Sequence, residues 1–339
     1  MKQQQLNILV YASVFYPGIG GIENHTLFLV REFVKMGHKV KVVTEQSQDG
    51  AEPLDQIEII HASNKLAQLR AFFWSDIVYM PNITLKGVWL FLFNPFKKWV
   101  ISHNDFHLMY SNDWKTKFKN FLIKRASANI SVSYSVAKFL KEPSHVIYNC
   151  YDNDIFKRYP DVQRVYDFVF VGRLVSQKGC DLLISACSEL DQAFTLNIVG
   201  DGYEYETLKA KVAALKMDHQ IKFLGFKQGE ELARCLNQHK TMIVPSLDVE
   251  GFGIVALEGL ACGCHMIVSD AGGLSEAVGS YGKVFPMKDK ETLKTYLNES
   301  MTTHNAKTES SELDNYLNEH TKSSVAQKYL SVFTQLILN

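Results

Sequence analysis

The chain has 339 residues, 46% of them hydrophobic, so it is too long for one compact domain and too apolar to be disordered. Its 36 basic and 36 acidic residues balance, which argues against a basic nucleic-acid binder. The charges are unevenly placed, because residues 1–150 hold 17 Lys and Arg against 11 Asp and Glu. A chain polarised in this way can place one face on an anionic surface.

The sequence predicts a cytoplasmic protein. Met1 and Lys2 precede three glutamines and then a strand-like run, which is unlike a signal peptide. The most apolar run, Val88–Phe93, is too short to span a bilayer. The six cysteines include no C-x2-C pair, and we expect them to be free buried thiols in a reducing compartment.

In the first half, short apolar runs alternate with helical stretches, which predicts a parallel sheet wound on both faces. The expected strands are Leu6–Ala12, Val40–Thr44, Ile77–Met80, Trp99–Ser102, Ile130–Ser133 and Val146–Tyr148. Gly18, Gly20 and Gly21 separate the first strand from a helix expected over Glu23–Met36. A nucleotide-binding turn would lie there. Because the pattern is Gly-x-Gly-Gly and not that of a dinucleotide fold, a purely structural turn remains an alternative.

His103 and His107 follow the strand Trp99–Ser102. Their spacing resembles that of metal ligands, but the glutamate of a zincin is missing and the pair does not lie within a helix. We therefore do not expect a metal. His103 lies at the carboxyl end of a strand, where ligands of such sheets bind, so ligand contact and a partly buried loop histidine both remain open.

The segment Trp114–Arg125 predicts a basic helix with an aromatic side. That side carries Trp114, Phe118, Phe121, Leu122 and Arg125. Residues 86–125 hold eight basic and two acidic residues. Such a helix can lie in a membrane interface, and it can equally be a half-buried helix with a solvated lysine face. An anionic membrane surface is thus a candidate partner, with the protein peripheral on the cytoplasmic side.

A polar, turn-rich segment, Asn149–Gln163, predicts the join between two domains. Asp152 and Asp154 form a D-x-D pattern there, which binds metal and nucleotide sugar in another fold. Asp and Asn also form turns readily, and we expect a structural role. The domains are expected over residues 1–150 and 164–320.

The second half repeats the strand–helix pattern. Its expected strands are Phe168–Val171, Leu196–Val199, Ile221–Leu224, Met242–Val244, Met266–Ser269 and Val284–Phe285. Arg173 and Lys178 follow the first of these, bracketed by Gly172 and Gly179. Glycines permit close backbone approach, and these two cations suit phosphate oxygens. A solvated loop pair is the alternative.

Between Thr241 and Ser269 the pattern predicts a strand, a glycine-bearing loop, a helix over Ile254–Ala261 and another strand. The start of that helix offers free backbone N–H groups to an anion. Glu250 and Glu258 flank it, with seven residues between them. Carboxylates beside a phosphate are unsuitable as charge partners, but they can accept hydrogen bonds from sugar hydroxyls.

This segment resembles the E-x7-E motif of the family 4 retaining glycosyltransferases, which have the GT-B fold. Other pieces match in family order over most of the chain. They are Gly20–Glu23, Val171–Leu174, Lys178–Gly179, Ile198–Gly202, Phe223–Gly225 and Gly272–Glu276. The resemblance implies an α/β protein with two Rossmann-like, doubly wound parallel-sheet domains facing a cleft. The first domain would bind the acceptor and the second the donor, and the last helix, 321–338, would pack back on the first.

The resemblance also implies the reaction and the roles of the residues. A hexosyl group would move with retention from a UDP- or GDP-sugar to a saccharide or lipid-linked saccharide, in polysaccharide or glycolipid synthesis. The implied catalytic residues are Arg173, Lys178, Glu250 and His103. The implied donor-binding residues are Gly20, Gly21, Gly172, Gly225, Phe252, Gly253, Ile254, Val255 and Glu258. No metal or other cofactor is expected.

Two other classes of function remain open. A GT-B phosphorylase or a sugar-nucleotide epimerase would share these motifs, and product analysis with and without an acceptor separates them. A sugar-binding protein without turnover would not hydrolyse a donor slowly, as an isolated transferase does.

Overall fold

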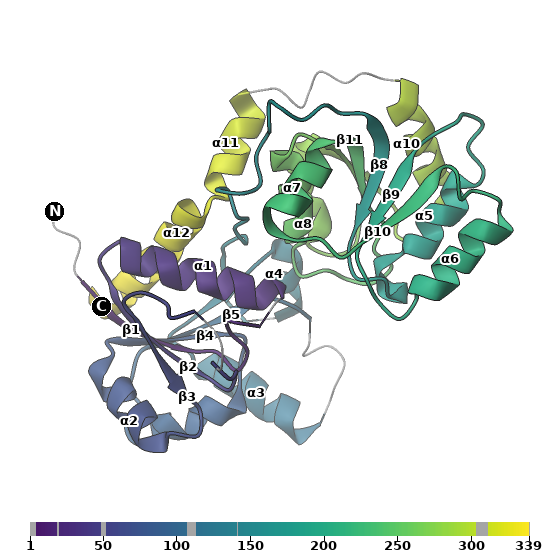
Figure 1. The fold of residues 1–339 in the computed structure, drawn as a ribbon. Helices are drawn as coiled ribbons and strands as arrows, with labels where there is room; N and C mark the ends of the chain where they lie inside the picture. Colours follow the sequence, from purple (N-terminus) through teal and green to yellow (C-terminus); the bar gives the residue numbers. More distant parts are fainter. Residues whose placement is uncertain are drawn as a thin grey trace. The chain divides into compact units, whose positions relative to one another are not determined.

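The computed structural model describes residues 5–18, 20–48, 52–106, 113–140, 142–302 and 311–338. His107, the second histidine of the predicted pair, lies outside these ranges. The chain folds as two compact units (Figure 1). The first comprises Met1–Cys150 and His320–Asn339, and the second comprises Tyr151–Glu319.

The first unit is built on a parallel sheet with the strand order β3-β2-β1-β4-β5-β6-β7. Its strands are β1 (Asn7–Tyr11), β2 (Lys39–Thr44), β3 (Ile57–His61), β4 (Ile77–Pro81), β5 (Trp99–His103), β6 (Ala128–Ser131) and β7 (His145–Val146). The expected parallel sheet is confirmed. Strand β3 was not predicted, because Glu58 interrupts its apolar run. In this edge strand only Ile60 is buried.

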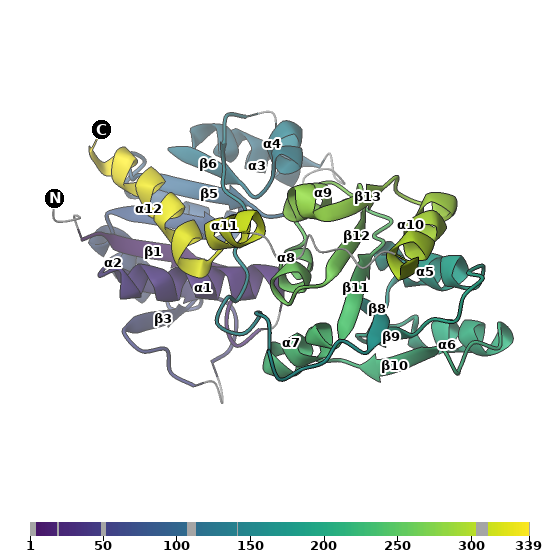
Figure 2. The ribbon, with the colours of Figure 1, turned by 90° about the horizontal axis from the view of Figure 1, so that it is seen from above.

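Helices cover both faces of this sheet. One face carries α1 (Gly21–Lys35) and α12 (Lys322–Leu338), which pack side by side (Figure 2). The other carries α2 (Lys65–Trp74), the 3-10 helix η1 (Leu85–Leu92) and α3 (Trp114–Arg125); α4 (Tyr134–Leu140) follows β6. The C-terminal helix enters the core of the first unit through Tyr329 and Phe333, whose rings meet Tyr79 of β4.

The second unit is built on a parallel sheet with the order β10-β9-β8-β11-β12-β13. Its strands are β8 (Tyr166–Val171), β9 (Leu196–Val199), β10 (Ile221–Gly225), β11 (His239–Val244), β12 (His265–Ser269) and β13 (Gly282–Phe285). The order reverses between β8 and β11, so loops leaving these two neighbours diverge and leave room for a ligand.

Helices cover both faces of the second sheet as well. One face carries α5 (Cys180–Cys187), α6 (Tyr205–Ala214) and α10 (Lys290–Thr302), which share a core under the sheet. The other helices are α7 (Gly229–Asn237), α8 (Ile254–Ala261), α9 (Leu274–Val278) and α11 (Ser311–Glu319), with 3-10 turns η3 (Ser176–Lys178) and η4 (Gly279–Tyr281). Helices α3 and α8 have the bounds that the sequence predicted.

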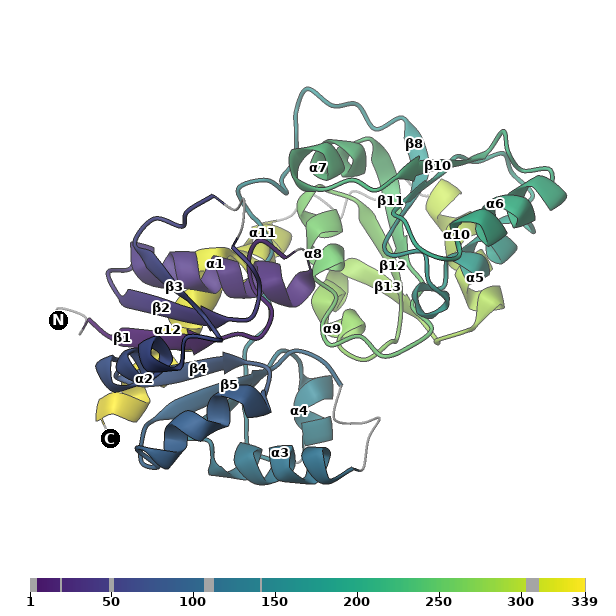
Figure 3. The same ribbon diagram turned by 60° about the horizontal axis from the view of Figure 1, so that its bottom comes forward.

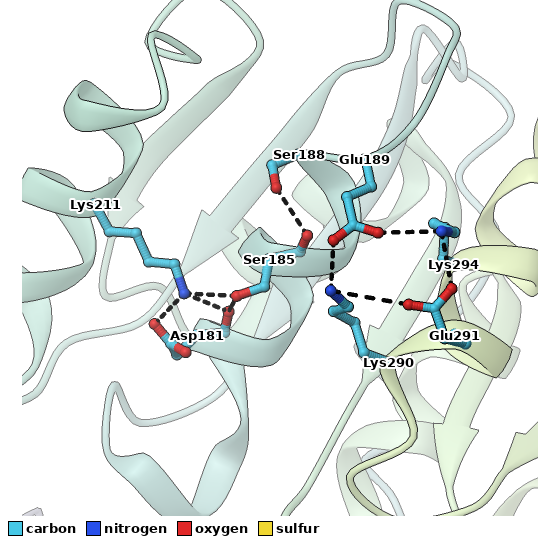
Figure 4. Close-up of polar contacts among 8 residues, drawn as sticks. All are labelled: Asp181, Ser185, Ser188, Glu189, Lys211, Lys290, Glu291 and Lys294. Carbon is cyan, nitrogen blue, oxygen red and sulfur yellow. Dashed lines mark hydrogen bonds and ion pairs between the residues drawn. The ribbon is translucent and has the colours of Figure 1, made fainter.

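Ion pairs reinforce the contact between α5 and α10 at the surface (Figure 4). Glu189, just beyond α5, pairs with Lys290 and Lys294 of α10, and Lys294 also pairs with Glu291. Lys211 of α6 reaches Asp181 of α5 at 2.5 Å and the hydroxyl of Ser185 at 2.6 Å. These groups are partly exposed, so their ion pairs contribute little to stability and chiefly fix the orientation of the helices.

The join between the units lies earlier than residue 164, since residues from Tyr151 onward belong to the second unit. Asn237 of α7 fixes this segment. Its side-chain oxygen accepts the N–H of Tyr159 at 2.9 Å, and its amide nitrogen donates to the carbonyl of Lys157 at 2.9 Å. The polar composition of the segment reflects such anchoring to a domain surface. Within the described ranges, no helix has the length and hydropathy needed to cross a bilayer.

Candidate functional site

The candidate donor site of the second unit lies at the carboxyl edge of its sheet, around β8 and β11. Backbone hydrogen bonds hold this edge together. The N–H of Gly172 donates to the carbonyl of Val199 at 3.1 Å, and that of Gly200 to Gly225 at 2.9 Å. Gly200 has φ +143°, and a Cβ there would overlap the carbonyl of Gly172. The predicted glycines therefore leave a bare backbone edge beside the loops that carry charge.

Arg173 and Lys178 both leave β8 toward this edge. Arg173 is exposed, and among the described residues no side-chain hydrogen bond or ion pair holds it. Lys178 closes the turn η3 and is followed by Gly179, which has φ +71°. A Cβ on Gly179 would overlap the carbonyl of Pro245 at the end of β11, so only glycine lets the two loops pack this closely.

Lys178 is not free in this structure, because its Nζ contacts Glu250. The distance from Lys178 Nζ to Glu250 Oε1 is 2.5 Å, and both side chains are largely buried. The hydroxyl of Ser246 donates to the same carboxylate oxygen at 2.6 Å. The carbonyl of Ser246 in turn accepts the hydroxyl of Ser269 at 2.7 Å. A chain of contacts thus orients Glu250, and sequence reasoning did not identify Ser246.

The loop that carries Glu250 is attached to the next strand's loop. Glu250 forms a parallel bridge with Gly272: its N–H donates to Ala271, and its carbonyl accepts from Gly273. Gly253 caps α8 with φ +96°, and a Cβ there would meet Leu274 of α9. Close packing against α9 therefore explains the glycine at position 253.

Helix α8 begins at Ile254 with no side-chain cap and no acidic residue in its first turn. The first N–H groups of a helix have no partner within it, and they carry a partial positive charge. Phe252 is buried, so its side chain anchors the loop, while Gly253, Ile254 and Val255 are partly exposed. This helix start and the cations after β8 suit an anion with several oxygens.

Glu258 lies on the second turn of α8 and is half-buried. Burial raises the pKa of its carboxyl to about 7, and the negative charge of Asp152 adds to the effect. Asp152 itself closes a turn, because its carbonyl accepts the N–H of Phe156 at 2.8 Å. The predicted turn role of the D-x-D segment is observed, and the same turn brings a carboxylate close to Glu258.

The glycine loop of the first unit leads into α1, with Gly20 as its N-cap in extended conformation. The carboxylate of Glu23, in the first turn, lies so close to Gly20 that a side chain there would collide with it. Glu23 therefore already supplies a negative charge to this helix start. An incoming phosphate near Gly20 or Gly21 would have to displace it.

His103 ends β5 and is 2% exposed, so it is a buried residue and not a loop histidine. Its Nε2 lies 3.0 Å from Oδ1 of Asn129. The amide nitrogen of Asn129 donates to the carbonyl of Ile123, which turns its oxygen toward the ring. Nε2 therefore carries the proton and donates to Asn129.

Sequence reasoning missed a cavity of about 520 Å³ at the carboxyl ends of β1, β2 and β3. It is lined by Tyr11, Glu45, His61, Ala62, Ser63, Lys65 and Lys86. Among the described residues, the Tyr11 hydroxyl and one Glu45 oxygen are buried without a hydrogen-bond partner. Burial raises the pKa of Tyr11 to about 12, so the hydroxyl stays protonated and can donate. Tyr11, Glu45 and His61 end or directly follow a strand, which is the signal that could have revealed the cavity.

Within the parts of the chain that the structure describes, no three His, Cys, Asp or Glu side chains converge on a point suited to a metal ion. The six cysteines are buried, as expected, and none of them forms a disulfide with another described residue. The buried thiol of Cys264 donates a hydrogen bond to the carbonyl of Leu236, so it is part of the packed core.

Two doubly wound parallel-sheet domains with these loops define the GT-B class of fold. Two family models match the sequence. Glycosyl transferases group 1 covers residues 152–322, and Glycosyltransferase Family 4 covers residues 19–155. The chain therefore belongs to the group 1 glycosyl transferases, and the second match confirms the predicted resemblance to family 4.

Similar proteins agree with this membership. An uncharacterised glycosyltransferase of Methanocaldococcus jannaschii, MJ1178, is 34% identical over 185 residues, which span 52% of this chain and 50% of that protein. The gpi3 subunit of the phosphatidylinositol N-acetylglucosaminyltransferase of Schizosaccharomyces pombe is 25% identical over 87% of this chain and 73% of its own. The structure of Anabaena Alr3699/HepE in complex with UDP superposes with a TM-score of 0.82 at 20% identity, over 97% of this chain and 100% of that one.

Proposed function

We propose that this chain is a retaining glycosyltransferase that transfers a hexosyl group from a nucleoside diphosphate sugar to a saccharide or lipid-linked saccharide. The observation that carries the proposal is the group formed by Arg173, Lys178, Glu250 and the uncapped start of α8. A diphosphate needs cations and N–H donors, and a sugar needs acceptors beside them. This edge of the sheet supplies both.

The donor would bind in the second unit. Its diphosphate would lie between Arg173 and the backbone N–H groups of residues 253–255, with the bare edge at Gly172 and Gly225 leaving space for it. Glu258 would accept from ribose hydroxyls. Glu250, already fixed by Ser246, would accept from hydroxyls of the transferred sugar. Lys178 would then exchange part of its contact with Glu250 for a phosphate oxygen.

The reaction would proceed on one face of the sugar. The bond from the anomeric carbon to the diphosphate oxygen breaks, and the acceptor oxygen forms its bond on the same side. The proton of the acceptor hydroxyl passes to the departing diphosphate. Arg173 and Lys178 stabilise the charge that grows on the leaving group, so we propose that no divalent metal is required.

The acceptor would bind in the first unit. Its cavity beside Tyr11 and Glu45 offers one donor and one acceptor without partners among the described residues, which suits hydroxyl groups. His103 and the glycine loop would complete the acceptor side. The gpi3 relative, whose name specifies phosphatidylinositol, supports an acceptor carried by a lipid. We propose a cytoplasmic enzyme that takes part in polysaccharide or glycolipid synthesis at a membrane.

A donor panel tests this function. UDP-, GDP- and ADP-sugars are screened by thermal shift, and the stabilising donor is then followed for slow hydrolysis and for transfer, with and without EDTA. Arg173→Ala and Lys178→Ala should each lower kcat/KM by about a hundredfold, since each removes a charge that serves the transition state. The exposed Lys222→Ala is the control. Full activity of the double variant, or activity abolished by EDTA and restored by Mg²⁺, would contradict the proposed site.

A further inference from the structure

The outer sides of η1 and α3 form one surface of the first unit, which we call the η1–α3 surface. The strand order runs β4, β5, β6, so the two connections between them cross the same face of the sheet. Both elements contribute to one core cluster there, with Leu90 from η1 and Leu122 and Ile123 from α3. Figure 3 shows α2 and α3 on the side of the sheet away from α1.

This surface exposes large apolar side chains that the core does not use. Leu92 of η1 is 83% exposed and Trp114 of α3 68%, and Phe118 and Phe121 are also exposed. In the segment that follows η1, which we count with this surface, Phe93 is exposed and Phe96 is 89% exposed. The rings of Phe118 and Phe121 stack at 6.2 Å, and the Arg125 guanidinium lies 5.2 Å from the centre of Phe121. Helix α3 therefore buries its Leu122–Ile123 side and presents its aromatic residues outward, so Leu122 is not part of the exposed aromatic side with which the sequence grouped it.

Cations surround these rings. Residues 86–125 carry eight Lys and Arg against two acidic residues. Within the described residues, no ion pair holds Lys115, Lys117 or Lys119. Lys97 is different, because its Nζ donates to the carbonyl of Ser75 and lies over the ring of Phe72. The free charge of the surface therefore comes chiefly from α3.

We propose that the η1–α3 surface docks on an anionic lipid bilayer. Interfacial helices combine lysine with Trp and Phe, which insert at the headgroup level while the ammonium groups meet anionic lipids. Protein-binding surfaces are, by contrast, depleted in lysine. The inference rests on the proposed function in one respect: docking would bring the enzyme to a lipid-borne acceptor.

Flotation with liposomes tests the surface without donor or acceptor. The full chain is mixed with neutral phosphatidylcholine vesicles and with vesicles containing phosphatidylserine, at low and high salt. Wild type should float with the anionic vesicles at low salt and less at high salt, because salt screens exposed charges. A triple variant, Lys115→Gln, Lys117→Gln and Lys119→Gln, should partition roughly a hundredfold less, at about fivefold per charge.

Two further variants make the result specific. The matched control changes Lys157, Lys209 and Lys222, exposed lysines of the second unit, to Gln and should float like wild type. Replacing Trp114, Phe118 and Phe121 by Ser should also reduce flotation, since these rings provide the apolar contribution to membrane binding. Absence of wild-type flotation at low salt, or equal loss in the test and control triples, overturns the proposal. Because nucleotide-sugar binding is measured on the same proteins, failure of docking is distinguishable from failure of the proposed transferase function.

Discussion

Ser246 controls the orientation of Glu250. Its hydroxyl donates to the Glu250 carboxylate at 2.6 Å from a fully buried position, while Lys178 contacts the same oxygen. A charge-assisted hydrogen bond of this kind contributes about 1.5–3 kcal/mol. In the proposed reaction Ser246 is therefore a positioning residue, which would act on substrate only through the glutamate.

Ser246→Ala should lower kcat about tenfold and leave nucleotide affinity unchanged, because the sugar contact is affected and the ribose contact is not. Steady-state kinetics and calorimetric titration of the nucleoside diphosphate measure the two effects. Ser185→Ala, on the exposed side of α5, is the control. A parallel loss of nucleotide affinity would mean that Ser246 merely supports the fold of the site.

Glu258 should make donor binding dependent on pH. Burial holds its pKa at about 7 instead of 4.5, so the carboxyl gains a proton as the pH falls from 8 to 6. Loss of the charge weakens a hydrogen bond from ribose by about 1 kcal/mol, or roughly fivefold. Titrating a nucleoside diphosphate sugar into wild type should show this decline.

The Glu258→Gln variant should bind the same ligand more weakly at pH 8 and with a flat pH profile. Glu206→Gln, exposed on α6, should keep the wild-type profile. If the decline persists in Glu258→Gln, another group near the donor site titrates, and the assignment of the ribose contact fails.

At the scale of elements, α10 shows what attaches a helix to its domain. Leu293 and Leu297 are fully buried in the core shared with α5 and α6. Lys290 and Lys294 make the ion pairs drawn in Figure 4. The burial of two leucines contributes more stability than the exposed ion pairs. Water and salt screen the ion pairs, whereas removing a leucine leaves a cavity that nothing fills.

Leu297→Ala should therefore cost about 2–5 kcal/mol and lower Tm by roughly 10 °C. Lys294→Met should shift Tm by no more than about 2 °C, and the shift should vanish at high salt. Differential scanning calorimetry measures both variants. Comparable losses in the two would show that the ion-pair network, and not the leucine side, anchors α10.

At the scale of the whole molecule, each unit contains a histidine buried in neutral form. Burial lowers the pKa of His25 to about 4 in the first unit, and that of His239 to about 4 in the second. The His239 ring is fixed by Cys235 and Asn197. Below pH 6.5 these histidines are protonated in the unfolded chain but not in the folded chain. The stability that they contribute is therefore fully present above pH 6.5 and decreases as the pH falls toward 4.

The loss of unfolding free energy should approach about 3 kcal/mol for each domain, because the pKa of each histidine falls from 6.5 to about 4 on folding. All four tryptophans lie in the first unit, so their fluorescence during urea unfolding follows His25 separately. His25→Leu should flatten the decline between pH 6.5 and 4, and the exposed His61→Leu should not. An unchanged slope in His25→Leu would assign the acid sensitivity to other groups.

The sequence by itself determined features that depend on neighbours along the chain. The bounds of α3 and α8 follow from apolar periodicity and from Gly253, and the parallel sheets follow from short apolar runs between helices. The spacing of Glu250 and Glu258 also follows from the order of residues alone. Such features are local, because backbone geometry and glycine conformation act within one or two turns.

Only the tertiary structure decided which groups meet across strands. Lys178 reaches Glu250 because β8 and β11 are neighbours in the sheet, and His103 meets Asn129 because β5 lies beside β6. Lys97 turns inward while the lysines of α3 stay outside, although both belong to the same basic segment. These contacts depend on strand order and burial, which join residues far apart in sequence and leave no periodic signal in it.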